Sequence, residues 1–192
     1  MIELYDKADC TGCSACANIC PRGCITMTAD SEGFLYPEVN TDICVDCRLC
    51  EEVCPMINKP MPHDIKAVYG AKNKDDSVRF TSSSGGMFTL FAEAVLNEGG
   101  LVVGAALDEN HTVKHCIIDS MDELTKLRGS KYVQSIIGDT YTKVREYLRA
   151  GKTVLFSGTP CQIAGLKRFL IKPFNNLIPI DVVCHGVPSP RV

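Results

Sequence analysis

The chain has 192 residues, of which 45% are hydrophobic and 22% are charged, so it can bury the core of one large domain or two small ones. Its formal net charge of -3, without a cluster of lysine or arginine, argues against a nucleic-acid-binding protein. The longest apolar run, residues 101–107, is too short to span a bilayer, and the N-terminus lacks the apolar core of a secretion signal. We therefore expect a cytoplasmic protein without a membrane span.

The cysteines carry the most information about function. The chain has 12 of them, and those before residue 55 far outnumber those after it. In a chain without a secretion signal, this number indicates metal or redox chemistry rather than disulfide bonds. The uneven distribution predicts two domains, residues 1–60 and 65–192, and the proline-containing stretch NKPMPHD at 58–64 predicts a linker or turn between them.

The first segment contains an internal duplication. The stretch CTGCSACANICP at 10–21 recurs as CVDCRLCEEVCP at 44–55, and CITMTADSEGFLYPEV between them predicts two short strands with a turn at Gly33. Each copy has the C-x2-C-x2-C-x3-C-P spacing of bacterial ferredoxins with two 4Fe-4S clusters. In that arrangement a tight loop presents three thiolates to one cluster, and the fourth cysteine reaches the other cluster.

This spacing predicts two sets of cluster ligands. We call Cys10, Cys13, Cys16 and Cys54 the first set, and Cys44, Cys47, Cys50 and Cys20 the second set. Pairs of the form C-x2-C also bind zinc, but the third in-step cysteine, the following proline and the duplication favour iron-sulfur clusters. Cys24 lies outside both runs, and we expect it to be a small buried packing residue.

The second segment alternates helix and strand patterns. A helix is predicted to start at the serine caps of SSSGGMFTLFAEAVLNEGG and to end at its last two glycines. Strands are predicted at 101–107 and 112–119, helices at 121–127 and 139–150, and then TVLFSG as a strand, PCQIAGLKRFL as a helix and LIPIDVVC as a strand. The predicted fold class is α+β: a small two-cluster ferredoxin-like domain, then an α/β domain with a mixed sheet flanked by helices.

Two polar stretches of the second segment are candidates for phosphate binding. Ser82, Ser83 and Ser84 with the glycines after them are predicted at a helix N-terminus, where free N–H groups either bind a phosphate or are simply capped. In RGSKYVQS, Lys131 either faces a phosphate or lies on the surface. The residues alone leave both alternatives open.

The stretch GTPCQ places a cysteine at the start of a helix. Thr159 is the expected N-cap and Pro160 the first helical residue, so Cys161 lies near the positive end of the helix dipole, which favours a thiolate. It is a candidate nucleophile or metal ligand. Cys161 and Cys184 both follow the C-terminal ends of strands, where open α/β sheets bind ligands, so they are candidates to share a third cluster. We expect His115 near a surface turn and not beside these cysteines.

The motifs SSSGGMF, GSKYVQS, GTPCQIAGLKRFL and DVVCHGVPSP follow a two-cluster ferredoxin module in this order. Over essentially the whole chain, this combination resembles the family of beta subunits of coenzyme F-420 hydrogenases and dehydrogenases, although the chain stops inside the second family domain. Members are iron-sulfur flavoproteins that bind FAD and pass electrons between clusters and a deazaflavin or another two-electron acceptor. The resemblance implies a flavin site lined by Ser83, Ser84, Gly85, Gly86, Ser130, Lys131 and Thr159, with Cys161 and Cys184 as candidate ligands of a third 4Fe-4S cluster beside it.

The leading functional prediction is an iron-sulfur flavoprotein oxidoreductase, or part of one. It would pass electrons between 4Fe-4S clusters and a flavin-linked two-electron acceptor such as the deazaflavin coenzyme. The alternative is a non-enzymatic two-cluster electron-transfer subunit that docks to a larger redox complex, and a third possibility is a colourless zinc-dependent interaction module. The expected partner is a redox protein: a ferredoxin, or a hydrogenase or dehydrogenase subunit.

Overall fold

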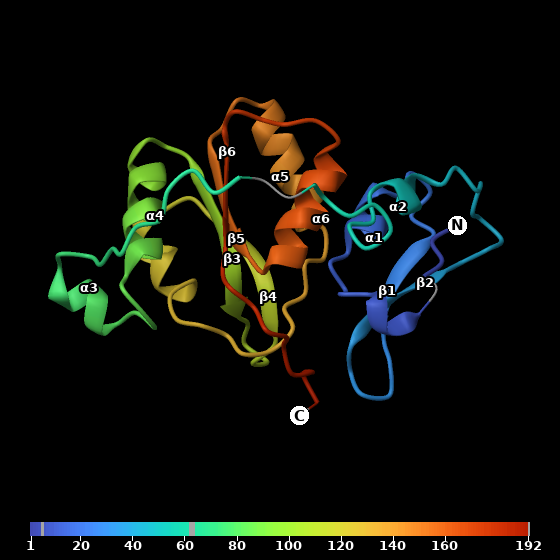
Figure 1. The fold of residues 1–192 in the computed structure, drawn as a ribbon, viewed down its shortest axis with the longest axis horizontal. Helices are drawn as coiled ribbons and strands as arrows, with labels where there is room; N and C mark the ends of the chain where they lie inside the picture. The colour runs from blue at the N-terminus through green and yellow to red at the C-terminus, as the bar shows by residue number, and fades with distance from the viewer. Residues whose placement is uncertain (5, 62–63, 192) are drawn as a thin grey trace.

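The computed structural model describes residues 1–4, 6–61 and 64–191, so part of the predicted linker at 58–64 lies outside the described residues. The chain forms one two-stranded sheet and one four-stranded sheet (Figure 1). We call residues 1–57 the N-terminal module and the part from α3 onward the sheet module. In the described ranges, no helix is long and apolar enough to cross a membrane.

The N-terminal module is built on the duplicated cysteine loops. Its elements are the 3-10 helix η1 (Lys7–Asp9), α1 (Ala15–Ile19), β1 (Ile25–Ala29), β2 (Leu35–Val39) and α2 (Leu49–Glu52). The two strands form an antiparallel hairpin in which Ile25 pairs with Val39, which confirms the two predicted strands. The short helices α1 and α2 follow the two cysteine loops at equivalent positions, so the duplication in sequence is also a duplication in structure.

The sheet module is a mixed sheet flanked by helices, as predicted. Its elements are α3 (Asp76–Phe80), α4 (Met87–Asn97), β3 (Leu101–Leu107), β4 (Val113–Ile118), the 3-10 helix η2 (Met121–Lys126), α5 (Thr140–Arg149), β5 (Val154–Gly158), α6 (Pro160–Leu170) and β6 (Leu177–Asp181). The strand order is β4-β3-β5-β6, with β3 antiparallel to β4 and the other neighbours parallel. In Figure 1, α4 lies on one face of the sheet, and α5 and α6 lie on the face toward the N-terminal module.

The start of α4 differs from the prediction that serines cap it. Its N-cap is Gly86, whose φ of 74° is left-handed, a conformation that glycine adopts without the steric cost of a side chain. Ser82 is bonded elsewhere, since its hydroxyl donates to the Val78 carbonyl at 2.6 Å. The C-terminal end agrees with the prediction: the helix ends at Asn97 and Gly99 is left-handed at φ 73°.

Two hydrophobic cores cover the two faces of the four-stranded sheet. The core under α4 includes Ala92, Val95, Val102, Leu124 and Leu155. The other core includes Val103, Tyr141, Phe156, Leu166 and Phe169 and continues into the N-terminal module through Ala15, Ile19 and Val53. Because each fully buried large apolar side chain contributes about 1.5–3 kcal/mol, this shared core holds the two modules together.

The contact between the modules depends on a glycine in α6. A Cβ atom on Gly165 would lie 3.0 Å from Cys13 Sγ and 3.2 Å from the Tyr141 hydroxyl. These distances are below ordinary van der Waals contact, so only a residue without a side chain lets α6 approach the first cysteine loop this closely.

We predict that Gly165→Ala destabilises the protein, although alanine in an ordinary helix is favoured over glycine by about 0.5–1 kcal/mol. Overpacking costs about 1–3 kcal/mol, and the predicted cluster would hold Cys13 in place against the new methyl group. The measurements are the free energy of unfolding and the iron content after purification. Ala164→Gly is the control, because it loses helix propensity without adding atoms and should keep its iron. A Gly165→Ala variant with raised stability and full iron would contradict the prediction.

Candidate functional site

The cysteines of the first set lie near one another, on the side of the N-terminal module that faces α6. Burial is the main cause that raises the pKa of Cys13 to about 12, and the neighbouring thiols of Cys161, Cys54 and Cys10 act in the same direction. Burial also raises the pKa of Cys10 and of Cys16, with an opposing contribution from backbone N–H groups next to the sulfurs. Cys16 and Cys54 are buried and Cys10 and Cys13 are partly buried. Sulfurs gathered in this way, three of them near backbone N–H groups, suit a 4Fe-4S cluster, whose iron would neutralise the thiolates.

The second cysteine set is closer to solvent. Its members, Cys20, Cys44, Cys47 and Cys50, line a small cavity together with Cys24. Cys47 is exposed, whereas Cys50 is buried. Cys24 is 4% exposed, and its sulfur lies 3.3 Å from Cys20 Sγ, so it is buried beside the second set as expected.

The two cysteine loops share an unusual backbone. Gly12 (φ 65°) and Asp46 (φ 46°) occupy equivalent positions in the duplication, and so do Ser14 (φ 63°) and Arg48 (φ 60°). A left-handed conformation costs a residue other than glycine roughly 1–2 kcal/mol, so it persists where the surroundings require it. The repeated conformation curls each loop in the same way around its three cysteines, and both loops therefore suit the same kind of cluster.

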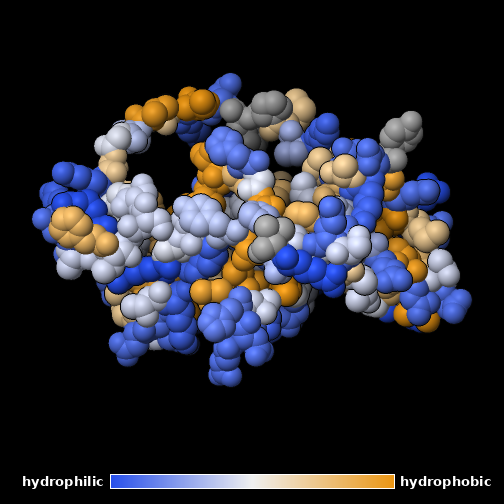
Figure 2. Space-filling model, turned by 90° about the horizontal axis from the view of Figure 1, so that it is seen from below, coloured by the Kyte–Doolittle hydropathy of each residue, from blue (hydrophilic) through white to orange (hydrophobic). Residues whose placement is uncertain are grey.

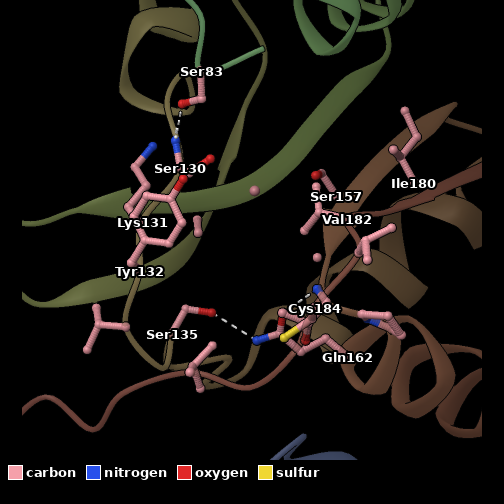
Figure 3. A pocket seen from close by; sticks show the side chains of 18 of the residues that line it. Ser83, Ser130, Lys131, Tyr132, Ser135, Ser157, Gln162, Ile180, Val182 and Cys184 are labelled. Carbon is pink, nitrogen blue, oxygen red and sulfur yellow. Dashed lines mark hydrogen bonds between the residues drawn. The ribbon is translucent and has the colours of Figure 1, made fainter. Parts of the chain in front are cut away.

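A large cavity of about 1140 Å³ lies beyond the C-terminal ends of β5 and β6. Pockets for drug-sized ligands are roughly 300–1,000 Å³, so this one can hold a larger molecule. Its wall includes every predicted cofactor residue, namely Ser83, Ser84, Gly85, Gly86, Ser130, Lys131 and Thr159, together with Cys10, Cys161 and Cys184. Figure 3 shows Ser83 and Ser130 across the cavity from Gln162 and Cys184. Residues far apart in the sequence thus line one space.

One end of the cavity suits an anion. The Ser130 N–H donates to Ser83 Oγ at 2.8 Å and joins the two polar stretches at the start of α4 (Figure 3). Lys131 Nζ donates to two backbone carbonyls at 3.0 and 2.8 Å, and burial lowers its pKa. The Nε of Arg128 is buried and has no hydrogen-bond partner among the residues that the structure describes. The sequence analysis did not single out Arg128, although it is the first residue of the stretch RGSKYVQS that contains Lys131.

His115 corrects the expectation of a surface turn, because it is buried in β4 with 7% of its surface exposed. Its ring stacks on Phe156 with centroids 5.3 Å apart, and Nε2 lies 3.1 Å from the Ser157 carbonyl, to which it can donate. Its Nδ1 then accepts from the Ser135 hydroxyl at 3.0 Å. The sequence did contain a signal for this burial: the two-residue period of a strand puts His115 on the same face as buried Val113.

The start of α6 agrees with the prediction and connects to His115. Thr159 is the N-cap of a complete capping box: Gln162 Oε1 accepts from the Thr159 N–H at 2.9 Å. Gln162 Nε2 donates to Ser135 Oγ at 2.9 Å (Figure 3), so a chain of hydrogen bonds runs from His115 to the N-terminus of α6. Cys161 lies on that first turn, with its sulfur 3.0 Å from Thr159 Oγ1.

Cys161 faces the first cysteine set, since its thiol is among the groups that raise the pKa of both Cys10 and Cys13. Cys184 lies on the same cavity, and its sulfur accepts from the Gly186 N–H at 3.4 Å. The two sulfurs are half of the ligands that a 4Fe-4S cluster takes, and Cys10 belongs to the first set. A third cluster therefore stays a prediction.

The N-terminal module closes one side of the cavity through contacts that the sequence did not reveal. Gln134 Oε1 accepts from the Leu35 N–H at 3.1 Å, and the Gln134 N–H donates to the Pro188 carbonyl at 3.2 Å. Ser189, which is 1% exposed, donates its hydroxyl to the Glu32 carbonyl in the β1–β2 turn. Segments near residues 34, 134 and 188 thus meet at the cavity wall.

Two parts of the chain match known families. Residues 9–57 match the family described as 4Fe-4S dicluster domain. Residues 68–138 match the family described as Coenzyme F420 hydrogenase/dehydrogenase, beta subunit N-term. The N-terminal module is therefore a two-cluster iron-sulfur module, and the zinc alternative is not supported.

Relatives of known name are longer than this chain. A subunit of the F(420)H(2) dehydrogenase of Methanosarcina mazei is 26% identical over 172 residues, which cover 83% of this chain and 48% of the relative. Coenzyme F420-dependent sulfite reductase of Methanocaldococcus jannaschii is 26% identical over 191 residues, 97% of this chain and 29% of the relative. The chain thus spans about half or less of these relatives. Among solved structures, the F420-reducing [NiFe] hydrogenase complex from Methanosarcina barkeri matches with a TM-score of 0.44 and 21% identity over 62% of this chain and 38% of the other.

We predict that Cys13→Ser loses the first cluster, about half of the iron, and destabilises the N-terminal module, because cluster binding and folding are coupled. Cys24→Ser should keep the full iron content and lose only about 1–3 kcal/mol, since it buries a hydroxyl beside the second set. Iron analysis and the free energy of unfolding of both variants give the comparison. Equal iron loss in the two variants would instead make Cys24 a ligand.

We also predict a pH dependence of stability from His115. Burial lowers the pKa of His115 to about 4, from 6.5 for a free side chain, so the unfolded chain binds the proton more tightly. Stability is complete above about pH 6.5 and falls as the pH drops toward 4, by about 3 kcal/mol at most. His115→Gln should flatten this slope in unfolding experiments between pH 5 and 8, whereas His111→Gln, on an exposed turn, should not. Identical slopes in all three proteins would refute the assignment.

Proposed function

With a 4Fe-4S dicluster domain followed by the N-terminal domain of coenzyme F420 hydrogenase/dehydrogenase beta subunits, this chain belongs to the family of these beta subunits, and we propose that it passes electrons between its clusters and a flavin-linked two-electron acceptor. The main support for the proposal comes from the residues that line the cavity. Cys10 of the first set and all the predicted cofactor residues line one cavity. A redox group bound in this cavity would therefore lie next to a cluster ligand.

The positions of the two cysteine sets support an order of electron transfer. The second set includes exposed Cys47, with Val45 60% exposed and Ile43 41% exposed near it. The first set faces α6 and the cavity. We propose that a redox protein, such as a ferredoxin or a hydrogenase or dehydrogenase subunit, exchanges electrons with the second cluster, and that the first cluster exchanges them with the group in the cavity.

Two features of the cavity support a flavin dinucleotide as the proposed bound group. Its diphosphate would lie at the anion-binding end, where the uncapped N-terminus of α4 meets Arg128 and Lys131. Its ring system would then lie toward Cys161 and the hydrogen-bonded pair Ser135 and Gln162. A flavin bound there would exchange electron pairs with a two-electron partner and single electrons with the clusters. The deazaflavin coenzyme that the relatives' names contain is the proposed two-electron partner.

A separate observation favours docking to a larger complex, which is compatible with the same electron path. The segment that leads into the sheet module exposes three large apolar side chains: Ile65 is 82% exposed, Val68 85% and Tyr69 85%. In Figure 2 this segment forms an arm with orange apolar residues that stands away from the body. Exposed apolar side chains that gather in one place are typical of surfaces covered by a partner.

The test is an anaerobic titration of FAD into the cluster-reconstituted protein, followed by flavin fluorescence and by the absorbance of the clusters before and after reduction. We predict binding, and we predict that Arg128→Met weakens it by about tenfold or more, because a charge-assisted hydrogen bond contributes about 1.5–3 kcal/mol. Lys143→Met is the control, since this α5 lysine pairs with Asp139, the N-cap of the helix, and does not line the cavity. Reducible clusters without any flavin binding would leave the two-cluster electron-transfer subunit as the function.

A further inference from the structure

We propose that Gln134 of the sheet module is a positioning residue for the first cluster, which holds the loop from Cys10 to Cys13 from outside and thereby sets the reduction potential of that cluster. The proposal rests on the two clusters of the proposed function and adds a residue that lies in neither cysteine run. It concerns the chain's own side chain and needs no group in the cavity.

The side chain of Gln134 is packed directly against the cluster loop. A Cβ atom on Gly12 would lie 2.5 Å from Gln134 Nε2, so the amide nitrogen occupies the space above the Gly12 backbone. The other end of the amide, Oε1, accepts from the Leu35 N–H at 3.1 Å. Gly12 is also confined from a second side, because the same Cβ atom would lie 2.9 Å from the Leu35 carbonyl. The loop is therefore held between β2 and Gln134.

The position of Gly12 affects the surroundings of the first cluster. The backbone N–H of Gly12 lies near the Cys10 sulfur: burial raises the pKa of this thiol, and the Gly12 N–H acts in the opposite direction. Cluster potentials depend on hydrogen bonds to the sulfurs and on solvent exposure. By packing on Gly12, Gln134 fixes the direction of this N–H and keeps water from that side of the loop. A residue of the second module thus acts on the potential through Gly12.

Gln134 is itself held in place on both sides along the chain. Its own N–H donates to the Pro188 carbonyl at 3.2 Å. The next residue, Ser135, accepts from Gln162 and donates to His115, both of which are buried. Because its neighbours are fixed by these bonds, the Gln134 side chain has a defined position from which to restrain the loop.

Other polar contacts between the modules lie elsewhere, and one of them provides a matched control. Ser189 reaches the Glu32 carbonyl in the β1–β2 turn, and Asn18 reaches the Gly138 carbonyl at 2.8 Å. Ser189→Ala removes an inter-module hydrogen bond without touching the Cys10–Cys13 loop. It therefore reports what a general loosening of the interface does.

The experiment is an anaerobic redox titration of the cluster-reconstituted full chain at pH 8, with the two clusters followed separately by electron paramagnetic resonance. In Gln134→Glu the acceptor for the Leu35 N–H is kept and a negative charge is added, so the midpoint potential of the first cluster should fall. In Gln134→Ala water gains access and stabilises the added electron, so the potential should rise. The second cluster should shift less in both variants, and Ser189→Ala should shift neither cluster.

Equal shifts of both clusters, or no shift of the first cluster in either variant, would overturn the role of Gln134. Shifts of the same size in Ser189→Ala would do the same, because they would show a general effect of the interface. Iron content and far-ultraviolet circular dichroism equal to the unmodified chain establish that each variant is folded and loaded. Failure to obtain two clusters in the unmodified chain would refute the proposed function instead, so the two failures are distinguishable.

Discussion

The close approach of α6 to the first cysteine loop is the contact on which the rest of the molecule depends. It requires Gly165, because any side chain there would collide with Cys13 and with the Tyr141 hydroxyl. The same helix begins at the cavity with Cys161 and buries Leu166 and Phe169 in the core shared by both modules. Within a few turns, this helix therefore contacts the predicted cluster ligand Cys13, lines the cavity and packs into the core.

A consequence of this arrangement is that the two modules cannot be regarded as separate units joined by a linker. The N-terminal module is small, and modules of this size have marginal cores of their own, which metal binding and a shared interface supplement. Its core residues Ala15 and Val53 belong to the same cluster of buried side chains as Phe156 in the sheet. Loss of the clusters would therefore also weaken the packing around the cavity.

The sequence was sufficient for the parts of the structure that local rules determine. Cysteine spacing predicted which cysteines lie near one another. Thr159 and Pro160 predicted the start of α6, because capping depends on residues only a few positions apart. Helix α4 began later than predicted, since the left-handed Gly86 took the place of a serine cap. The alternation of helices and strands was enough to predict a mixed sheet with helices on its faces.

Contacts between distant segments could not be predicted in this way. His115 meets Ser135 and Gln162, and Gln134 meets Leu35, only after the chain has folded. Nothing in the neighbourhood of these residues in the sequence specifies their partners. The buried Nε of Arg128 belongs to the same class, because its position on the cavity depends on the path of the whole segment that follows η2.

The duplicated loops also explain how a pseudo-symmetric module attaches in one direction. The two loops have the same backbone, so on geometry alone either one could face α6. The first copy has Gly12 and Ser14 where the second has Asp46 and Arg48. Turning the module around would put Asp46 at the position of Gly12, where even a Cβ atom would lie 2.5 Å from Gln134 Nε2. Divergence between the copies thus opposes the inverted attachment, so the direction in which the module attaches depends on side-chain size at a few loop positions.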